Sequence, residues 1–408
     1  MKVPLASNVL RPKDIQAATE VLNSGNLTMG ERVLRFESEM ADMLGVNHFV
    51  MVNSGSSANL AIFEALLRPA KGSGRLKLGD SVIVPAVAWP TTVWPIIQLG
   101  LDPVFVDVEF ETLALDLEKA EEVILNTQGK RFAAIFPIHP LGLALDHDRY
   151  LAFAEKHHLI LINDVCESLG ASRDGKSAGS VGLASSYSFY FSHHLTTMEG
   201  GGIGTNDDLL ADDLRSIRSH GWSRDRLDAD EHTGGLSETD SKFLFVSTGY
   251  NIRPMEIQAA IGSSQLPDLP SFVARRRQIA RAIHEGLDGT KLKVVDGGYF
   301  DSRSDPEQHS WMLIPIVVTG PNSENRRNQI IDYLKQSGID TRPVLTGNFL
   351  AQPSVRKILN YLPKPDIFPV ASAVSKTHFL VAAHHDLLDS QISHLVQSLR
   401  SAEQPAGD

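Results

Sequence analysis

Residues 159–164 read Leu-Ile-Leu-Ile-Asn-Asp, four apolar residues followed by an amide and a carboxylate. Four consecutive apolar residues predict a buried central strand, and this strand would end at Asp164. Because an unpaired buried charge is unfavourable, we expect the Asp164 carboxylate to meet a dedicated cationic partner. The alternative is a strand-end aspartate that caps the next turn or is solvated in a loop.

Short apolar runs on both sides of this strand alternate with stretches of helical periodicity. The spacers at 58–67, 117–125 and 146–156 place apolar residues at intervals of three to four. Such alternation predicts an α/β fold in which helices flank a mostly parallel, seven-stranded sheet. The expected strands are MVNS (51–54), SVIVPA (81–86), PVFVDV (103–108), AAIFPI (133–138), LILIND (159–164), SYSFYF (186–191) and GGIGTN (201–206).

A proline-containing break, LPDLP at 266–270, predicts a domain boundary. We expect residues 1–265 to form a large α/β domain and residues 266–408 a smaller α+β domain. Before the break, the polar stretch 223–242 predicts a loop, and 254–265 predicts a helix with Pro254 in its first turn. After the break, we expect helices at 272–287, 324–337 and 387–399 and a strand at 311–318.

The charge and cysteine content exclude several classes of protein. The 408 residues include 38 Lys plus Arg against 49 Asp plus Glu, a net charge of −11, which disfavours nucleic acid and anionic membranes as partners. The single cysteine, Cys166, excludes an intramolecular disulfide and an iron–sulfur cluster held by several thiolates of one chain. The N-terminus has no apolar signal segment, and prolines interrupt the uncharged stretch 82–101. We therefore expect a cytoplasmic protein with no membrane span and no metal.

Two other stretches carry residues suited to chemistry. In 54–59, SGSSAN, small residues close a strand and open a helix, where free N–H groups and the helix dipole can hold a phosphate; a plain Gly/Ser turn is the alternative. In 185–202, hydroxyls including Ser188 end a strand, and His193 and His194 follow. Adjacent histidines ahead of a glycine run are candidates for proton transfer near neutral pH, and the alternative is a structural role.

Taken together, the motifs resemble the sugar aminotransferase/dehydratase family of fold-type I pyridoxal-phosphate enzymes. The resemblance covers nearly the whole chain and rests on SGSSANL (54–60), Asp164 with Cys-Glu-Ser behind it, SFYFSHH (188–194) with EGG (199–201), SHGW (219–222) and GYNIRP (249–254). In that family a lysine six residues before the Glu of EGG forms a Schiff base with the cofactor. Here that position is His193. An imidazole cannot form this bond, so the resemblance implies the 3-dehydratase branch.

The resemblance also implies roles for individual residues. Asp164 would pair with the pyridine nitrogen and Trp89 would stack on the ring. Asn251 would reach the phosphate of the neighbouring subunit's site, which implies a homodimer with shared active sites. The remaining expected contacts are Ser56, Ser57 and Ser188 to the cofactor phosphate, Glu167 to its 3-hydroxyl, and His194, His220, Arg253 and Arg342 to substrate or cosubstrate.

The implied reaction is removal of the C3 hydroxyl from a nucleotide-linked 4-keto-6-deoxy sugar, with GDP-linked 4-keto-6-deoxymannose as the expected substrate. Pyridoxal phosphate would become pyridoxamine phosphate with glutamate as amino donor and 2-oxoglutarate as its product, His193 would move the proton, and ammonia would be released. The product would serve dideoxysugar (colitose), O-antigen and lipopolysaccharide biosynthesis. His194 is the rival base.

Two other functions stay open from the sequence. One is a nucleotide-sugar aminotransferase whose Schiff-base lysine lies elsewhere, with Lys176 or Lys242 as candidates. The other is an inactive homologue that binds sugar nucleotides.

Overall fold

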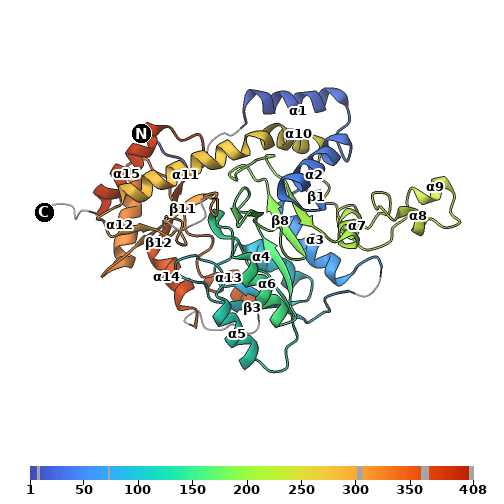
Figure 1. The fold of residues 1–408 in the computed structure, drawn as a ribbon, viewed down its shortest axis with the longest axis horizontal. Helices are drawn as coiled ribbons and strands as arrows, with labels where there is room; N and C mark the ends of the chain where they lie inside the picture. Colours follow the sequence, from blue (N-terminus) through green and yellow to red (C-terminus); the bar gives the residue numbers. More distant parts are fainter. Residues whose placement is uncertain (7–9, 72–73, 301–306, 360–366, 404–408) are drawn as a thin grey trace.

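A central sheet organises the structure (Figure 1). The computed structural model describes residues 1–6, 10–71, 74–300, 307–359 and 367–403. Within these ranges the sheet has seven strands in the order β1-β9-β8-β5-β4-β2-β3, and β9 alone runs antiparallel to its neighbours. The strands are β1 (His48–Val52), β2 (Ser81–Pro85), β3 (Asp102–Val106), β4 (Phe132–Ile135), β5 (Ile160–Asp164), β8 (Ala184–Ser188) and β9 (Gly201–Thr205).

Helices cover both faces of this sheet, as the continuous apolar runs of its strands require. In β2, Val82 and Val84 pack on one face and Ile83 on the other. The first face is covered by α3 (Gly55–Leu67), α4 (Pro90–Gln98) and α7 (Asp208–Ile217). The second face is covered by α5 (Leu117–Asn126) and α6 (His147–Lys156), and beside them by α2 (Glu31–Leu44). The predicted α/β layering is confirmed.

Each predicted strand overlaps a strand of the sheet, but several predictions run too far toward the C-terminus, by three residues after Ile135 and after Ser188. The chain leaves the sheet after Ser188, whereas the apolar run predicts a strand to residue 191. The amide of Tyr190 donates to the Ser188 hydroxyl at 3.4 Å, and the amide of His193 donates to the Tyr190 carbonyl at 3.0 Å. These bonds form a turn that aims residues 190–193 away from the strand direction.

Pro95 lies inside α4, although proline usually disrupts a helix. A residue at this position would normally donate its N–H to the Thr91 carbonyl, and proline has none. The Thr91 carbonyl instead accepts from the side-chain amide of Asn59 at 3.1 Å. The proline therefore leaves an acceptor that ties α3 to α4.

A second, smaller sheet follows in the chain. It joins β10 (Leu292–Val294), β11 (Leu313–Val318) and β12 (His378–Ala382), all antiparallel. It packs against α11 (Leu269–Gly286), α12 (Ser323–Gln336) and α15 (Asp389–Glu403). Val3 forms a bridge with Ile339 and joins the same apolar cluster, so the first residues of the chain pack on this later part. The boundary at residue 265 stays a prediction.

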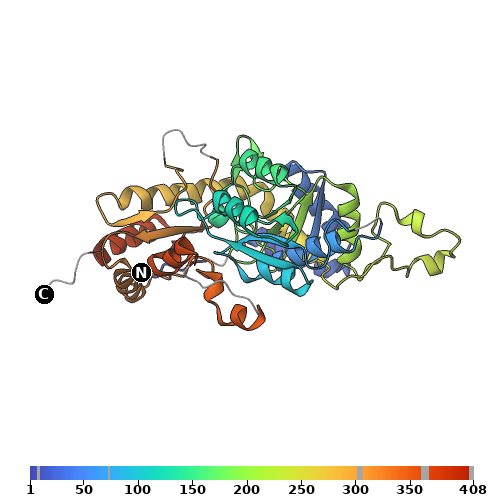
Figure 2. The ribbon, with the colours of Figure 1, turned by 90° about the horizontal axis from the view of Figure 1, so that it is seen from below.

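A long arm leaves the body between α7 and α10 (Figures 1 and 2). The segment predicted as a loop contains two short helices, α8 (Ala229–His232) and α9 (Glu238–Ser241). The helix that follows, α10 (Glu256–Gln265), begins after Pro254 rather than with it, because the Gln258 side chain accepts from the Met255 amide at 2.8 Å and sets the start there. Among the described residues, no helix is long and apolar enough to cross a membrane.

The remaining elements lie around these sheets, and α1 lies along α10 at the top of Figure 1. They are α1 (Pro12–Ser24), β6 (Ser172–Arg173), β7 (Lys176–Ser177), α13 (Pro353–Ile358), α14 (Pro369–Thr377) and the short 3-10 turns η1 (Pro140–Gly142), η2 (Leu266–Asp268) and η3 (Phe349–Ala351).

The crossing of β9 under the start of α3 gives a first prediction. A Cβ at Gly201 would lie 2.3 Å from the carbonyl carbon of Ser54 and 2.4 Å from the amide of Gly55, so Gly201→Ala must push the two segments apart. We expect a loss of about 2 kcal/mol in the free energy of unfolding, measured in urea. Gly204→Ala in the same strand is the control, because its nearest contact would be 3.4 Å. Equal stability of the two variants would contradict this packing.

Candidate active site

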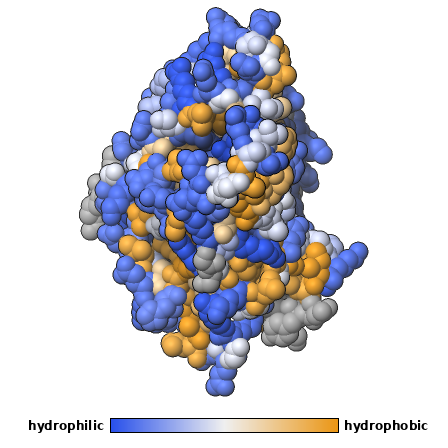
Figure 3. All heavy atoms as spheres, turned by 90° about the vertical axis from the view of Figure 1, so that its right-hand side faces the viewer, coloured by the Kyte–Doolittle hydropathy of each residue, from blue (hydrophilic) through white to orange (hydrophobic). Residues whose placement is uncertain are grey.

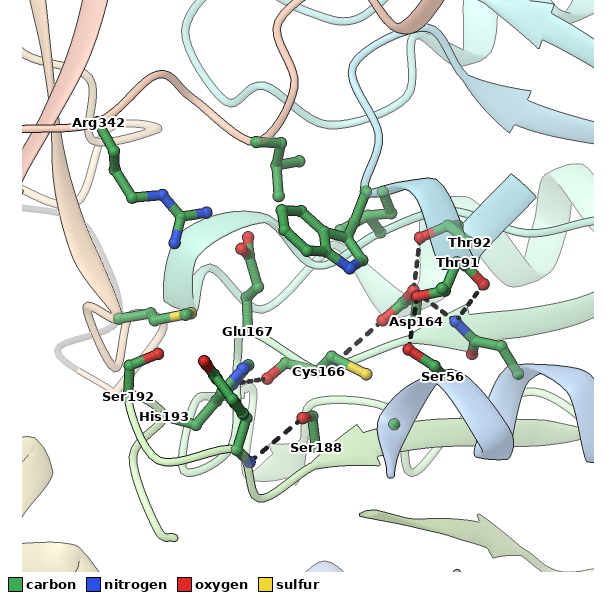
Figure 4. A pocket seen from close by; sticks show the side chains of 17 residues that line it. Ser56, Thr91, Thr92, Asp164, Cys166, Glu167, Ser188, Ser192, His193 and Arg342 are labelled. Carbon is green, nitrogen blue, oxygen red and sulfur yellow. Dashed lines mark hydrogen bonds between the residues drawn. The ribbon is translucent and has the colours of Figure 1, made fainter. Parts of the chain in front are cut away.

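A pocket opens where β5 and β8 end beside the start of α3 (Figure 4). Seven of the predicted residues line it, namely Ser56, Trp89, Asp164, Glu167, Ser188, His193 and Arg342. They come from distant parts of the sequence, and Arg342 reaches in from the segment that bridges to Leu380 of β12. Parallel strands bring their carboxyl ends to one edge of a sheet, which explains why these residues meet.

Asp164 lies at the floor of the pocket and is buried, with 4% of its surface exposed. Its Oδ2 accepts from the Thr92 hydroxyl at 2.8 Å and from the Asn59 side-chain amide at 3.1 Å, and its Oδ1 accepts from the Cys166 amide at 3.1 Å. All three donors are neutral. Within the described ranges the chain supplies no lysine, arginine or histidine in an ion pair with this carboxylate. A cationic ring nitrogen in the pocket would supply the missing partner.

The start of α3 shapes the end of the pocket suited to phosphate. Ser54 caps the helix, with its Oγ accepting from the Ser57 amide at 3.1 Å, and Ser56 donates to the Thr91 hydroxyl at 2.9 Å. A Cβ at Gly55 would lie 2.7 Å from the Ser188 Cβ, so only glycine lets the helix start approach Ser188 this closely. Two hydroxyls and a helix N-terminus therefore converge there. The Ser57 side chain faces Ser54 and does not line the pocket.

The two adjacent histidines point in different directions. His193 lines the pocket, and its Nδ1 lies 2.6 Å from the Cys166 carbonyl oxygen. Because a carbonyl can only accept, Nδ1 carries the hydrogen and Nε2 is left as the basic nitrogen. His194 is buried away from the pocket, with Nε2 3.2 Å from the Ser310 carbonyl.

Burial and charge keep the His193 ring neutral. Burial lowers its pKa to about 4, the nearby charges of Arg342 and Arg276 act in the same direction, and the bond to the Cys166 carbonyl opposes them. A neutral imidazole at pH 7 can accept a proton without first losing one.

The Glu167 carboxylate and the Arg342 guanidinium point toward one another in the pocket (Figure 4). Burial raises the pKa of Glu167 to about 7, although the Arg342 charge and a 3.1 Å bond from the Leu141 amide to its Oε2 oppose the rise. Trp89 is the residue before α4 and is 48% exposed, with the Arg342 guanidinium carbon 6.0 Å from its ring centroid. The exposed ring leaves a flat aromatic face at the entrance.

Three predicted residues lie together outside the pocket. Ser219 bridges Asn251, the His220 amide donates to the Tyr250 carbonyl at 2.8 Å, and Arg253 donates to the Ser219 hydroxyl at 3.3 Å. His220, Asn251 and Arg253 therefore share one surface at the base of the arm. Within one chain they do not reach the pocket of that chain.

The candidate Schiff-base lysines are also distant from the pocket. Lys176 pairs with Asp148 at 3.4 Å, and Lys242 pairs with Glu238 at 3.0 Å, both on exposed surface. Among the described residues that line the pocket there is no lysine. The described residues as a whole include no cluster of side chains suited to a metal.

The sequence reasoning missed several pocket residues. Asn59 lay in the quoted SGSSANL motif but received no role, and Thr92 was not considered; both donate to Asp164. Cys166 was read only as a lone thiol, yet both its amide and its carbonyl bind functional side chains. Asn59 had a detectable signal, since an amide on an otherwise apolar helix needs a partner. The contact of Thr92 depends on the α4 geometry, which the sequence does not show.

Comparison with known proteins identifies the fold and the family. The fold is that of fold-type I pyridoxal-phosphate enzymes, and the sequence model of the DegT/DnrJ/EryC1/StrS aminotransferase family matches residues 8–400. The chain belongs to that family.

Similar relatives cover almost the full length. GDP-4-keto-6-deoxy-D-mannose 3-dehydratase of Yersinia pseudotuberculosis is 36% identical over 399 residues, which are 97% of this chain and 98% of the relative. The Escherichia coli GDP-4-keto-6-deoxy-D-mannose-3-dehydratase with bound hydrated PLP superposes with a TM-score of 0.88 at 35% identity, covering 98% of this chain and 99% of that chain. A structure of GDP-4-keto-6-deoxymannose-3-dehydratase with a trapped PLP-glutamate geminal diamine also gives 0.88 at 35% identity, covering 98% and 100%.

The raised pKa of Glu167 gives a prediction about stability. A carboxyl pKa raised from 4.5 to about 7 means that the folded state binds the proton more tightly than the unfolded state. Its contribution is complete below about pH 4.5 and is lost as the pH rises through about 7. Glu167→Gln removes this loss and retains an oxygen for the Leu141 amide.

The variant should therefore gain stability over wild type as the pH rises, by at most about 3 kcal/mol between about pH 5 and pH 8.5. Urea unfolding of the cofactor-free protein measures the difference. Glu118→Gln, at an exposed position on α5, is the matched control. A constant difference between Glu167→Gln and wild type would refute the shift.

Proposed function

We propose that this protein is a 3-dehydratase dependent on pyridoxal and pyridoxamine phosphate. Its substrate is GDP-4-keto-6-deoxy-D-mannose and its product GDP-4-keto-3,6-dideoxy-D-mannose, with glutamate as amino donor and release of ammonia. The observation that carries the proposal is the imidazole of His193 in the pocket at the position where the family has its lysine. The names of the full-length relatives support the substrate and the glutamate.

The pocket residues fit this cofactor. The Asp164 carboxylate has three neutral donors and faces the pocket, which suits a pyridinium nitrogen. Ser56 and Ser188 both line the pocket beside the helix start, where only Gly55 fits against Ser188, which suits the phosphate. Trp89 would cover the ring and Glu167 would approach its 3-hydroxyl; Ser57 would support the helix start from behind. When bound, the cofactor supplies an amine that condenses with a ketone and a ring that accepts an electron pair.

His193 moves the proton in this proposal. Its Nδ1 is fixed by the Cys166 carbonyl. Nε2 would therefore take a proton from the carbon attached to the cofactor's pyridine ring and deliver it to the departing C3 hydroxyl of the sugar. The low pKa of His193 keeps its imidazole in the base form at neutral pH. The same low pKa makes the protonated imidazole a strong acid toward the leaving hydroxyl.

Arg342 is the only arginine among the described residues that line the pocket. A guanidinium binds carboxylates and diphosphates in a fork, so we assign Arg342 to the glutamate carboxylate or the sugar-nucleotide diphosphate. Burial lowers the pKa of His194 well below 6.5, and with its ring directed at Ser310 we assign it a supporting place behind His193 rather than a contact with substrate.

We propose a homodimer in which the arm of one subunit completes the pocket of the other. Asn251, His220 and Arg253 lie at the base of the arm, outside the pocket of their own chain. The arm carries exposed apolar side chains, and the end of the molecule that bears it shows orange patches among hydrophilic atoms (Figure 3). The exposed arm residues are Leu227, Leu236, Phe243 and Phe245, at 72%, 46%, 69% and 52%. Such surface is unfavourable in water unless a partner covers it.

We place this reaction in the cytoplasmic synthesis of a surface polysaccharide. The product would feed the synthesis of a dideoxysugar such as colitose for the O-antigen of lipopolysaccharide. The free thiol of Cys166 in the pocket suits the reducing cytoplasm.

Substitution of His193 tests the chemistry. His193→Asn should abolish loss of the C3 oxygen, by at least about a thousandfold in rate, because no other histidine is among the described residues that line the pocket. His194→Asn is the matched neighbour and should retain the reaction, although it can cost stability. Mass spectrometry of the sugar nucleotide, with pyridoxal phosphate and glutamate present, scores loss of oxygen against gain of nitrogen. Unchanged turnover by His193→Asn, or stable amination by wild type, would overturn the proposal.

Mixed dimers test the shared site. His193→Asn and Asn251→Ala should each be inactive alone, because each lacks one part of every site. After the two variants are mixed and allowed to exchange subunits, about a quarter of the sites should be intact and activity should return to that level. Absence of any recovery, with exchange verified by mass spectrometry, would mean that the site lies within one chain.

A further inference from the structure

Arg276 is an unusual side chain for the interior. It lies on α11 with 1% of its surface exposed, and its guanidinium binds main-chain carbonyls instead of a carboxylate. Its Nη1 donates to the carbonyls of Trp311 and Met312 at 3.1 and 2.9 Å, and its Nη2 donates to the His193 carbonyl at 3.4 Å. Its Nε is buried without a partner in the described part of the chain.

Burying the Arg276 guanidinium against carbonyls in this way does not favour folding. Taking a guanidinium out of water costs several kcal/mol, and carbonyl oxygens return less than a carboxylate would. An apolar side chain of similar volume would fill the space at lower cost. The arginine is therefore better explained by what it holds.

Two of its three partners belong to the wall of the pocket. His193 and Met312 both line it, and they come from opposite parts of the chain, the turn after β8 and the residue before β11. Arg276 joins these two segments directly behind the pocket. A planar fork with several donors can bridge two segments in a fixed geometry, which the compact ammonium of lysine cannot do.

We propose that Arg276 is a positioning residue, which fixes the main chain at His193 so that the imidazole stays over the pocket with Nδ1 on the Cys166 carbonyl. This inference rests on the function proposed above for His193.

The charge of Arg276 also acts on His193, because it favours the neutral imidazole. Burial lowers the pKa of Arg276 to about 10, so it remains a cation at neutral pH. That charge helps to hold the pKa of His193 low, after burial and Arg342. The other titratable groups that face Arg276 are His194, His384, His385 and Asp386.

Arg277 offers a matched control on the same helix. It also clamps carbonyls, with Nε donating to His309 at 2.8 Å and Nη2 donating to Glu307 at 3.0 Å, but neither partner lines the pocket. Arg276→Met and Arg277→Met therefore remove the same kind of side chain, and only the first should reach His193.

We expect Arg276→Met to lower kcat for loss of the C3 oxygen at least about tenfold while KM changes less than about threefold, and Arg277→Met to leave kcat within about twofold. Arg276→Lys retains the charge without the fork and should be intermediate. The second readout is the nitrogen-15 spectrum of the His193 imidazole, assigned with His193→Asn. Wild type should show Nδ1–H alone, and Arg276→Met should show a mixture of tautomers.

A wild-type kcat together with a wild-type imidazole spectrum in Arg276→Met would overturn the proposal. If Arg276→Met does not fold, the spectrum and kcat of Arg276→Lys decide, and wild-type values there also count against it. If the wild-type protein removes no oxygen from the sugar, the proposed function fails, but the comparison of tautomers still decides whether Arg276 orients His193.

Discussion

The peptide at Cys166 connects the two side chains on which the site depends. Its N–H donates to Oδ1 of Asp164, and its carbonyl accepts from Nδ1 of His193. The carboxylate and the base that the proposed chemistry requires are thereby fixed relative to one another by one residue of main chain. Catalysis by a positioned base requires this kind of rigidity, because a small displacement of the base lowers the rate strongly. The proposed chemistry therefore depends on the turn after β5 as much as on either side chain.

Several separate features of the fold hold these two side chains in place. The order of the strands places β5 beside β8, so the chain that carries His193 leaves the sheet next to Asp164. Pro95 removes a helix bond and frees a carbonyl for Asn59, whose amide also reaches Asp164. Arg276 holds the far side of the His193 turn. Each of these features acts on Asp164, on His193 or on both.

The sequence predicted the layers and much of the pocket for a clear physical reason. Apolar runs and motif spacing report which residues are buried and which end a strand, so they predict the places of Asp164, Ser188 and His193. The direction in which a side chain points is not predicted in this way. The opposite orientations of His193 and His194 arise from a turn set by Ser188 and Tyr190, and that turn follows a run that still reads as strand. The contacts of Thr92 and Arg276 join segments far apart in the chain, which local patterns cannot report.

If His193 stands in place of the family's lysine, the pocket holds its cofactor without a covalent bond to the protein. Intact-mass measurement after loading with pyridoxal phosphate and reduction with borohydride tests this. The protein mass should stay that of the bare chain, and the cofactor should be released on denaturation. A mass increase equal to one reduced cofactor, located at a lysine such as Lys176 or Lys242, would contradict it.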